Sequence, residues 1–534
     1  MNPPCMHATP SPSAASPEAH PHTRPTSIDG RHFPVVIVGA GINGIGVFRD
    51  LCLQGVECLL IDKGDVGSGA SSAPSRMIHG GLRYLENAEF SLVQESAQER
   101  NNLLRTAPHL VQPLHTVIPL SSRLGGLFGS VLRFFGAHPP ARSRGVLAVW
   151  LGLMLYALMG RKNRSLPGHH VQATSAADKA LLADDVRWTA HFYDAWITHP
   201  ERLMHELIAD GHRAQRRSVV SNHCALTALH GQRLTLRDTV LDTEVHVTAD
   251  TVVNATGAWL EQLSTLFSVP GGRLVGTKGS HLVLDHPALL AALQGRMVYF
   301  EAKDGRVCIV YPFNGRVLAG STDIPVTDPD RVQTDASEID YLLAVLHEVF
   351  PRLHFAREQI VYTFVGVRPL ATLHSRNAAP GTPGKISRDH HVIVDGPQAA
   401  RAIAVVNLVG GKWTTFRALA EEATDAVLAL LGKTRAVSTA GLPIPATDLG
   451  FDGGDIQSLR RLCRLTGVVH LSDLVLHRSL AAFLGHLDAT ALETLAQAAS
   501  EELGWGIDRK DFELNRCRAI LVNKHHVRRL AEVH

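Results

Sequence analysis

Gly39, Gly41 and Gly44 form a G-x-G-x-x-G turn directly after an apolar run, a spacing that suits binding of a pyrophosphate. The first glycine permits a tight turn, the second lets the backbone approach the phosphates, and the third lets helix and strand pack closely. Free N–H groups at the start of the next helix would face the anion. Asp62, after the following apolar run, can accept hydrogen bonds from a ribose hydroxyl. This order predicts a dinucleotide site, whereas the glycines alone would also fit a structural turn.

A second stretch with chemical potential, SSAPSRMIHGGLRYLE, spans residues 71–86. Its glycine pair, Gly80 and Gly81, would let the backbone approach a bound group without side-chain collision. A further pair, 410–411, precedes Lys412 and a segment, 413–422, that is predicted to be a helix. The lysine charge and the helix N-terminus would together favour a negative charge nearby. On residue types alone, a structural turn with a solvated lysine is the alternative.

The elements that must position these turns follow from the hydrophobic pattern. The run from Phe33 to Gly64 has the length and order of a β-α-β unit. The stretch VVNATGAWL, from Val252, is typical of a buried strand that ends in glycine. Runs of β-branched residues alternate with turn residues over about 268–365, as in an antiparallel sheet. Three amphipathic helical patterns follow near the C-terminus, and Asp455 and Asp488 can cap the first two.

Composition limits the remaining possibilities. A chain of 534 residues with 45% hydrophobic residues predicts a globular protein of two or three domains. The 52 Lys and Arg nearly balance the 50 Asp and Glu, so the net charge gives no case for a nucleic-acid partner. Seven scattered cysteines without a C-x-x-C pair argue against a zinc site or a disulfide framework and suit a reducing cytoplasm.

The first residues are rich in Pro, Ser, Ala and His and contain no apolar run that could serve as a secretory signal. Their composition predicts a disordered tail over 1–32. His7, His20 and His22 could instead serve metal binding or targeting, but composition favours the tail and we expect no metal site.

The stretch IHGGLRYLE, residues 78–86, resembles the FAD-dependent glycerol-3-phosphate dehydrogenases of the D-amino-acid-oxidase-like flavoprotein superfamily. Other segments resemble the same family in the same order over about 34–425: SLPGHHVQ, YDAWITHPERL, VVNATGAW, GTKGSHLVL, GSTDIP, GVRPL, SRDH and GGKWTTFRALAE. Each segment is short, so their shared order makes the resemblance specific. It implies an α/β fold in which a Rossmann-like FAD-binding domain is interleaved with an antiparallel-sheet substrate domain and followed by a C-terminal helical domain.

The resemblance also implies boundaries and cofactor residues. The FAD-binding domain would comprise 33–110, 185–267 and 366–432. The apolar and basic segment would span 111–184, the substrate-side sheet would span 268–365, and the C-terminal helical domain would span 440–534. The residues expected to contact FAD are Gly39, Gly41, Asn43, Gly44, Asp62, Ser71, Ser72, Arg76, His79, Gly80, Gly81, Leu82, Ala255, Thr256, Gly257, Gly410, Gly411, Lys412 and Thr414.

The implied reaction is oxidation of sn-glycerol 3-phosphate to dihydroxyacetone phosphate by hydride transfer to flavin. Arginine suits the phosphate because its planar fork forms bidentate charged hydrogen bonds, and Arg83, Arg368 and Arg388 lie in family-like segments. An imidazole suits the general base. We favour His281 over His79, which could instead brace the flavin loop.

Other catalytic candidates have two interpretations each. Tyr84 could bond to the substrate or only pack, and Asp323 could orient a neighbour or form a turn. Lys412 is expected beside the flavin ring. We interpret His525 and His526 as surface residues, because adjacent residues do not share a helix face.

The segment 146–160 is uncharged, but it is shorter than the about 20 residues that a transmembrane helix needs. Basic residues flank it at 142, 144, 161, 162 and 164, so a helix lying in the membrane interface is favoured over a buried core helix. Because the family reduces membrane quinone, the resemblance implies a cytoplasmic protein at the inner face of the cell membrane.

Three alternative functions remain open. An oxidase would use the same site but pass electrons to oxygen, and a related flavoprotein would act on an amine. A non-catalytic scaffold would keep only the fold, because fold alone does not fix function. The C-terminal domain is expected to support the fold or to form a homodimer contact.

Overall fold

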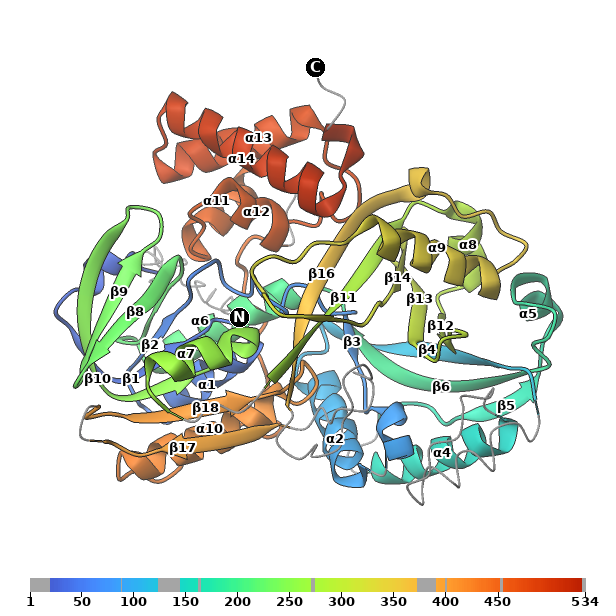
Figure 1. Ribbon diagram of the computed structural model, residues 1–534, viewed down its shortest axis with the longest axis horizontal. Helices are drawn as coiled ribbons and strands as arrows, with labels where there is room; N and C mark the ends of the chain where they lie inside the picture. Colours follow the sequence, from blue (N-terminus) through green and yellow to red (C-terminus); the bar gives the residue numbers. More distant parts are fainter. Residues whose placement is uncertain are drawn as a thin grey trace, which may run out of the picture.

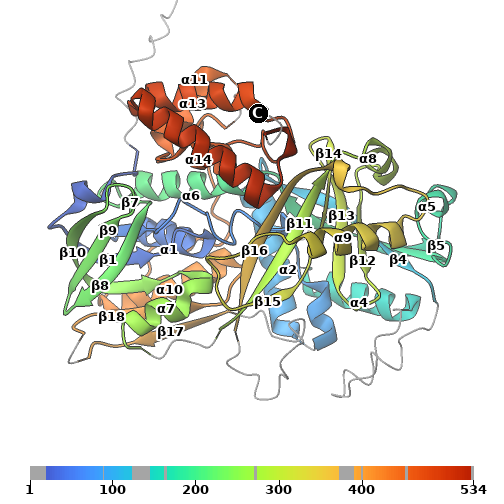
Figure 2. The ribbon, with the colours of Figure 1, turned by 45° about the horizontal axis from the view of Figure 1, so that its top comes forward.

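The computed structural model describes residues 20–87, 89–122, 145–161, 165–269, 274–371, 390–398, 401–451 and 455–530. In this part of the chain, two large sheets lie beside each other (Figure 1). The C-terminal helices lie across α6 and reach β16 of the second sheet (Figure 2).

The first sheet has the order β17-β18-β10-β1-β2-β7, with β8 and β9 continuing from β10. Its central strands are parallel: Val36 of β1 lies opposite Leu59 of β2 on one side and Val252 of β10 on the other. Continuous burial along these strands fits a parallel sheet covered on both faces. The strands are β1 (His32–Val38), β2 (Cys58–Ile61), β7 (Val219–Ser221), β8 (Cys224–His230), β9 (Arg233–Asp238), β10 (Thr243–Asn254), β17 (His391–Asp395) and β18 (Ala404–Val409).

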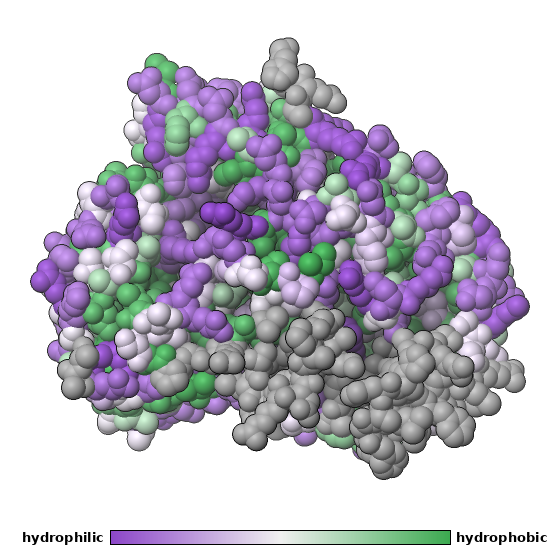
Figure 3. Space-filling view, in the orientation of Figure 1, coloured by the Kyte–Doolittle hydropathy of each residue, from purple (hydrophilic) through white to green (hydrophobic). Residues whose placement is uncertain are grey.

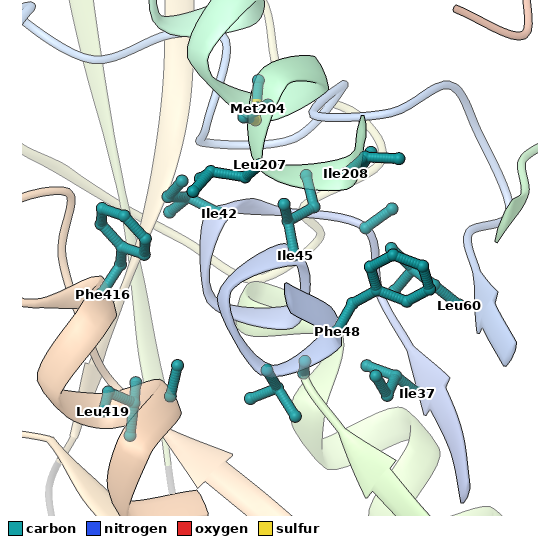
Figure 4. Close-up of a cluster of buried hydrophobic side chains, with 14 of the residues drawn as sticks. Ile37, Ile42, Ile45, Phe48, Leu60, Met204, Leu207, Ile208, Phe416 and Leu419 are labelled. Carbon is teal, nitrogen blue, oxygen red and sulfur yellow. The ribbon is translucent and has the colours of Figure 1, made fainter. Parts of the chain in front are cut away.

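Helix α1 (Ile42–Leu53) packs between α6 (Pro200–Ala214) and α10 (Phe416–Leu430) on one face of this sheet (Figure 4). Its Ile45 and Phe48 are fully buried in this cluster. The opposite face is covered by the β8–β9 hairpin and by α7 (Leu260–Leu266). The Rossmann-like domain expected from the sequence is therefore present.

The second sheet has the order β15-β11-β14-β13-β12-β4-β6-β3, with β16 paired to β11 and β5 paired to β6. Most pairs are antiparallel, and only β12 and β4 run parallel among the described strands. The strands are β3 (Met77–Ile78), β4 (Val111–Leu120), β5 (His170–Ala173), β6 (Trp188–Ile197), β11 (Leu274–Leu284), β12 (Met297–Glu301), β13 (Val307–Phe313), β14 (Arg316–Gly320), β15 (Ile324–Val326) and β16 (Ile360–Ala371).

Shorter and peripheral helices complete the two layers. They are α2 (Phe90–Thr106), α4 (Val146–Met159), α5 (Ala176–Leu181), α8 (Pro287–Leu293) and α9 (Ala336–Val349).

Several strands of the second sheet lie outside the range, 268–365, that was predicted for the substrate-side sheet. β4 and β5 fall in the predicted apolar segment 111–184, and β6 falls in the part assigned to the FAD-binding domain. β16 begins in the predicted substrate domain, but from residue 366 on it falls in the part assigned to the FAD-binding domain. All four strands belong to the second sheet. Sheet membership depends on long-range pairing, such as the ten-residue ladder of β4 with β6, which hydrophobic periodicity does not reveal.

The end of the predicted disordered tail is also wrong, because residues 20–32 are ordered. Thr23 N–H donates to the Val220 carbonyl at 2.9 Å, and Val220 N–H donates to the Pro21 carbonyl at 3.0 Å. A 3-10 helix, Pro25–Ile28, then places Ile28 in the core. Burial of Ile28 and pairing with the edge of β7 therefore order this segment. His7 lies outside the described residues.

The C-terminal helices are α11 (Ile456–Leu465), α12 (Leu471–His477), α13 (Ala489–Leu503) and α14 (Ile507–His525). Asp455 and Asp488 accept backbone N–H bonds as the predicted caps of α11 and α13. The domain is docked by a buried pair in which Arg478 donates to both carboxylate oxygens of Asp65, at 2.7 and 2.9 Å.

The surface interpretation of His525 and His526 is wrong. The His525 ring stacks on Tyr362 with the ring centres 4.6 Å apart, and its Nδ1 donates to the Thr363 carbonyl at 2.9 Å. His526 Nδ1 lies 2.9 Å from Thr363 Oγ1. His526 follows the last residue of α14 and has a left-handed backbone conformation, with φ of 55°. Both side chains can therefore contact β16, although they are adjacent in the sequence.

Candidate functional site

A cavity of about 990 Å³ lies where the two sheets and the C-terminal helices meet. Its walls include the glycine-rich turn after β1, the loop 68–73, residues of β16, and residues of α12 and α14. In Figure 3, apolar side chains gather near the middle of this face, between the two sheet layers and below the C-terminal helices. The volume is at the upper end for a small-molecule or cofactor site.

The turn after β1 has the shape that a pyrophosphate requires. Gly39 has φ of +107°, and a Cβ there would lie 2.6 Å from the Ala255 carbonyl oxygen. Gly44 packs behind the turn, where a Cβ would lie 1.9 Å from the Gly39 carbonyl oxygen. Gly41 is the N-cap of α1, and Gly41, Ile42 and Asn43 line the cavity, so the N-terminus of that helix lies at its wall. The residues present therefore fit the phosphate portion of FAD.

Asp62 lies at the cavity wall directly after β2. Its Oδ2 accepts from Ala40 N–H at 2.7 Å and its Oδ1 accepts from Gly64 N–H at 2.9 Å. Burial raises the pKa of this carboxyl, and the two backbone donors oppose that effect. A carboxylate has about four acceptor positions, so capacity for a ribose hydroxyl remains after these bonds.

The loop 68–73 is joined to both halves of the FAD-binding domain. Ser71 Oγ accepts from Ile42 N–H at 2.9 Å, and the Ser71 carbonyl accepts from Trp413 Nε1 at 3.1 Å. Ser72 Oγ donates to the Gly69 carbonyl at 3.2 Å. The expected cofactor residues that line the cavity are Gly39, Gly41, Asn43, Asp62, Ser71, Ser72, Arg76, Ala255, Thr256, Gly257, Gly410, Gly411 and Lys412.

The segment after Gly411 differs from the expected helix. α10 begins at Phe416, and 412–415 form turns, so Lys412 does not lie at a helix N-terminus as predicted. Its Nζ donates to Ser96 Oγ of α2 at 2.6 Å and lies 4.5 Å from the centre of the Tyr84 ring. These contacts, rather than a helix N-terminus, hold the ammonium of Lys412, a residue that lines the cavity.

The loop 79–84 lies behind this wall. His79 N–H donates to Thr414 Oγ1 at 3.3 Å, and Gly80 N–H donates to the Tyr156 hydroxyl at 2.7 Å. Tyr84 is buried beneath Lys412, which favours packing of its ring. The 3-10 helix Leu82–Asn87 carries Leu82, Arg83 and Tyr84, and Arg83 is partly exposed.

Strands β11 and β16 bring the two principal catalytic candidates together. Arg368 lies opposite Thr277, and a Cβ on Gly279 would lie 2.1 Å from the guanidinium, so this glycine provides its space. Arg368 Nη2 donates to Ser321 Oγ at 2.7 Å, and Nη1 lies 3.3 Å from Asp323 Oδ1. Asp323 therefore orients a neighbouring side chain, one of its two predicted roles.

His281 is buried on β11, with its ring stacked on Phe364 at a centroid distance of 4.7 Å. Its Nε2 lies 2.6 Å from Ser75 Oγ. Burial, together with the charge of Arg368, lowers the pKa of His281 to about 3. The imidazole is therefore neutral near pH 7, with one ring nitrogen that carries no proton. Arg388 lies outside the described residues.

Arg76 lines the cavity, but its guanidinium is directed to α6. It lies between the Phe313 and Phe483 rings and pairs with Glu201 Oε1 at 3.3 Å. Burial would raise the pKa of Glu201, but Arg76 and His199 outweigh it and hold the pKa at about 2. A flavin hydrogen bond from this arginine thus competes with a buried ion pair.

Sequence reasoning missed the polar residues that hold Arg368 and His281. Ser75 and Ser321 contact the two side chains directly. Behind them, buried Glu338 accepts from Ser280 Oγ at 2.9 Å and Thr322 Oγ1 at 2.6 Å, and lies 2.7 Å from Lys278 Nζ. Glu338 is remote in sequence from β11, so no local signal could have indicated it.

Comparisons with known proteins agree with this geometry. The family model described as "FAD dependent oxidoreductase" (DAO) matches residues 34–426. A glycerol-3-phosphate dehydrogenase from Synechocystis is 32% identical over 438 residues, covering 76% of this chain and 72% of that protein. A D-erythritol 1-phosphate dehydrogenase from Brucella abortus is 29% identical, with 77% of each chain covered.

A solved structure shares the fold. It is a glycerol-3-phosphate dehydrogenase from Bacillus halodurans complexed with FAD, with a TM-score of 0.67 and 20% sequence identity. The match covers 96% of this chain and 98% of that one.

Gly39→Ala tests the glycine-rich turn. We expect FAD affinity to fall about tenfold or more, because the added methyl meets the Ala255 carbonyl and a non-glycine residue at this φ costs about 1–3 kcal/mol. Equilibrium titration of apoprotein with FAD, followed by flavin fluorescence, measures the change. Gly231→Ala is the control: φ there is +62°, and no atom lies within 4 Å of an added Cβ. Equal FAD affinity in the two variants would contradict this assignment.

Proposed function

Because the chain belongs to the DAO family of FAD-dependent oxidoreductases, we propose that it oxidises sn-glycerol 3-phosphate to dihydroxyacetone phosphate. The observation that carries the substrate assignment is that the paired strands β16 and β11 carry Arg368 and the neutral imidazole of His281, whose pKa the charge of Arg368 helps to lower. The names of the Synechocystis and Escherichia coli relatives support the same substrate, the latter at 30% identity.

Arg368 is the proposed phosphate ligand. Its side chain is 24% exposed, and it donates to Ser321 Oγ, to the Thr322 carbonyl and to Asp323. A guanidinium suits a phosphate because its planar fork forms bidentate charged hydrogen bonds. Arg83, and Arg388 from the segment that is not described, are the proposed additional cations.

His281 is the proposed acceptor of the C2 hydroxyl proton. Ser75 Oγ contacts its Nε2, so the proton reaches this nitrogen through the serine hydroxyl or after that hydroxyl turns aside. Phe364 stacking keeps the ring orientation fixed. Bound FAD supplies the acceptor for the C2 hydride, while Gly39, Asp62 and Ser71 would hold its phosphate and ribose portion.

D-erythritol 1-phosphate is a second candidate substrate, supported by the Brucella abortus relative. It is also a polyol phosphate, so Arg368 and His281 would serve the same roles. The two substrates differ in the length of the polyol, and comparison of their kcat/KM values separates them.

We further propose that electrons pass to membrane quinone through peripheral contact at the inner face of the cell membrane. No helix among the described residues is long and apolar enough to cross a membrane. Helix α4 buries one side and exposes an apolar stripe on the other. It is therefore neither a polar surface helix nor a fully buried core helix. The stripe comprises Leu147, Trp150, Leu151, Met154 and Leu158, which are 40–56% exposed.

Arg368→Ala tests the phosphate assignment. We expect the KM for glycerol 3-phosphate to rise about 30-fold, which corresponds to the ~2 kcal/mol cost of removing one partner of a charged pair. The flavin absorption spectrum should stay unchanged. Steady-state kinetics with an artificial electron acceptor measures KM. Arg357→Ala, which removes an exposed partner of Asp340, is the control and should leave KM unchanged. An unaltered KM in Arg368→Ala would remove this residue from the phosphate site.

The double substitution Leu151→Gln and Met154→Gln tests the lipid contact. Binding to vesicles containing anionic lipid should weaken about tenfold or more, because two exposed apolar side chains lose their burial energy in the interface. Co-sedimentation of the FAD-loaded protein measures binding. Ile507→Gln removes a 78% exposed apolar side chain on α14 and should bind as wild type does. Failure of the wild-type protein to bind, or equal binding by the double variant, would refute this role for α4.

A further inference from the structure

The inner side of α4 carries a buried polar group with no role in the proposed chemistry. The Tyr156 hydroxyl donates to Asp194 Oδ1 at 2.6 Å. It accepts from Gly80 N–H at 2.7 Å and from Arg100 Nη1 at 2.8 Å. Arg100 Nη1 also donates to Asp194 Oδ1 at 2.8 Å. Groups from α2, β6 and the loop 79–84 therefore meet at one hydroxyl on α4.

This cluster is ordered by its burial. Tyr156 is 4% exposed, and the side chains of Arg100 and Asp194 are each 5% exposed. Burial raises the pKa of Tyr156 far above its usual value, so the hydroxyl keeps its proton and its donor role towards Asp194. The direct bond from Gly80 N–H to Asp194 is longer, at 3.3 Å. The tyrosine hydroxyl is thus the principal partner of the Gly80 amide.

Gly80 begins a turn that leads to the cavity wall. Tyr84 N–H donates to the Gly81 carbonyl at 2.8 Å, which closes the turn. The Tyr84 ring then lies beneath the Lys412 ammonium, 4.5 Å from its centre, and Lys412 lines the cavity. A Cβ on Gly80 would lie 2.5 Å from the Tyr156 hydroxyl oxygen, so this contact leaves no room for displacement towards α4.

We propose that Tyr156 is a positioning residue for the flavin site. Its hydroxyl fixes the Gly80 amide and the turn to Tyr84, and Tyr84 in turn sets the position of the Lys412 ammonium at the cavity wall. The inference rests on the proposed function for the role of Lys412 beside the flavin ring. It gives the inner side of α4 a supporting role for the cavity wall, in addition to the exposed stripe on its outer side.

Tyr156→Phe in the full-length, FAD-loaded protein tests this role, because it removes the hydroxyl and keeps the ring. The flavin midpoint potential should fall, since a displaced ammonium stabilises the reduced, negatively charged cofactor less. The kcat should fall about tenfold, with the KM for glycerol 3-phosphate changed less than about twofold, as expected for a small misplacement near the reacting centre. Potentiometric titration of the flavin absorbance supplies the readout that is independent of activity.

Tyr341→Phe is the matched control. It removes a tyrosine hydroxyl on α9 that forms an exposed hydrogen bond to Asp304, and it should leave the potential unchanged. In a Lys412→Gln background, Tyr156→Phe should cause no further fall. A midpoint potential in Tyr156→Phe equal to that of wild type, or an equal fall in both backgrounds, would overturn the proposal.

If Tyr156→Phe does not retain FAD, Tyr84→Leu interrupts the same path, because it removes the ring beneath the Lys412 ammonium without changing any charge. Its potential should fall, and an unchanged potential would overturn the proposal. Failure of glycerol 3-phosphate to reduce the wild-type flavin would refute the proposed substrate. The potentiometric comparison would still decide the role of Tyr156.

Discussion

The close approach of two strand ends at Gly39 is the constraint on which the site depends. β1 and β10 are parallel neighbours, so the Gly39 turn and Ala255 meet at the same edge of the sheet. Any side chain at position 39 would occupy the space of the Ala255 carbonyl. Asp62, from the next strand, holds the same turn through Ala40 N–H. The glycine-rich turn, Asp62 and the start of α1 are therefore positioned together by one packing requirement.

Buried polar contacts join the rest of the molecule to this edge. Ser71 connects the loop 68–73 to α1, and the Asp65–Arg478 pair docks the C-terminal helices above it. Removing one partner of such a pair leaves an uncompensated charge, so these contacts fix geometry more than they add net stability. Residues of α12 and α14 line the cavity as a result. The C-terminal domain thus shapes the site, a role that its helical pattern alone did not indicate.

The sequence predicted the parts of the fold that are encoded locally. The β-α-β unit, the Asp455 and Asp488 caps and the Gly39 turn each depend on residues within a few positions, and the structure contains all of them. Sheet membership of β4, β5 and β6 depends on distant partners, and the predicted domain ranges did not group these strands with the rest of the second sheet. The same limit applies to the site: Arg368 and His281 were identifiable from their motifs, but Ser75 and Glu338 contact the cluster only through tertiary packing.

The most direct test of the account is an anaerobic titration of the FAD-loaded protein with glycerol 3-phosphate, followed by absorbance of the oxidised flavin. The account predicts bleaching that a quinone analogue reverses quickly and that air reverses only slowly. Rapid reoxidation by air would instead assign the acceptor as oxygen. A flavin that stays bound and oxidised at saturating glycerol 3-phosphate would contradict the substrate assignment while leaving the FAD site intact.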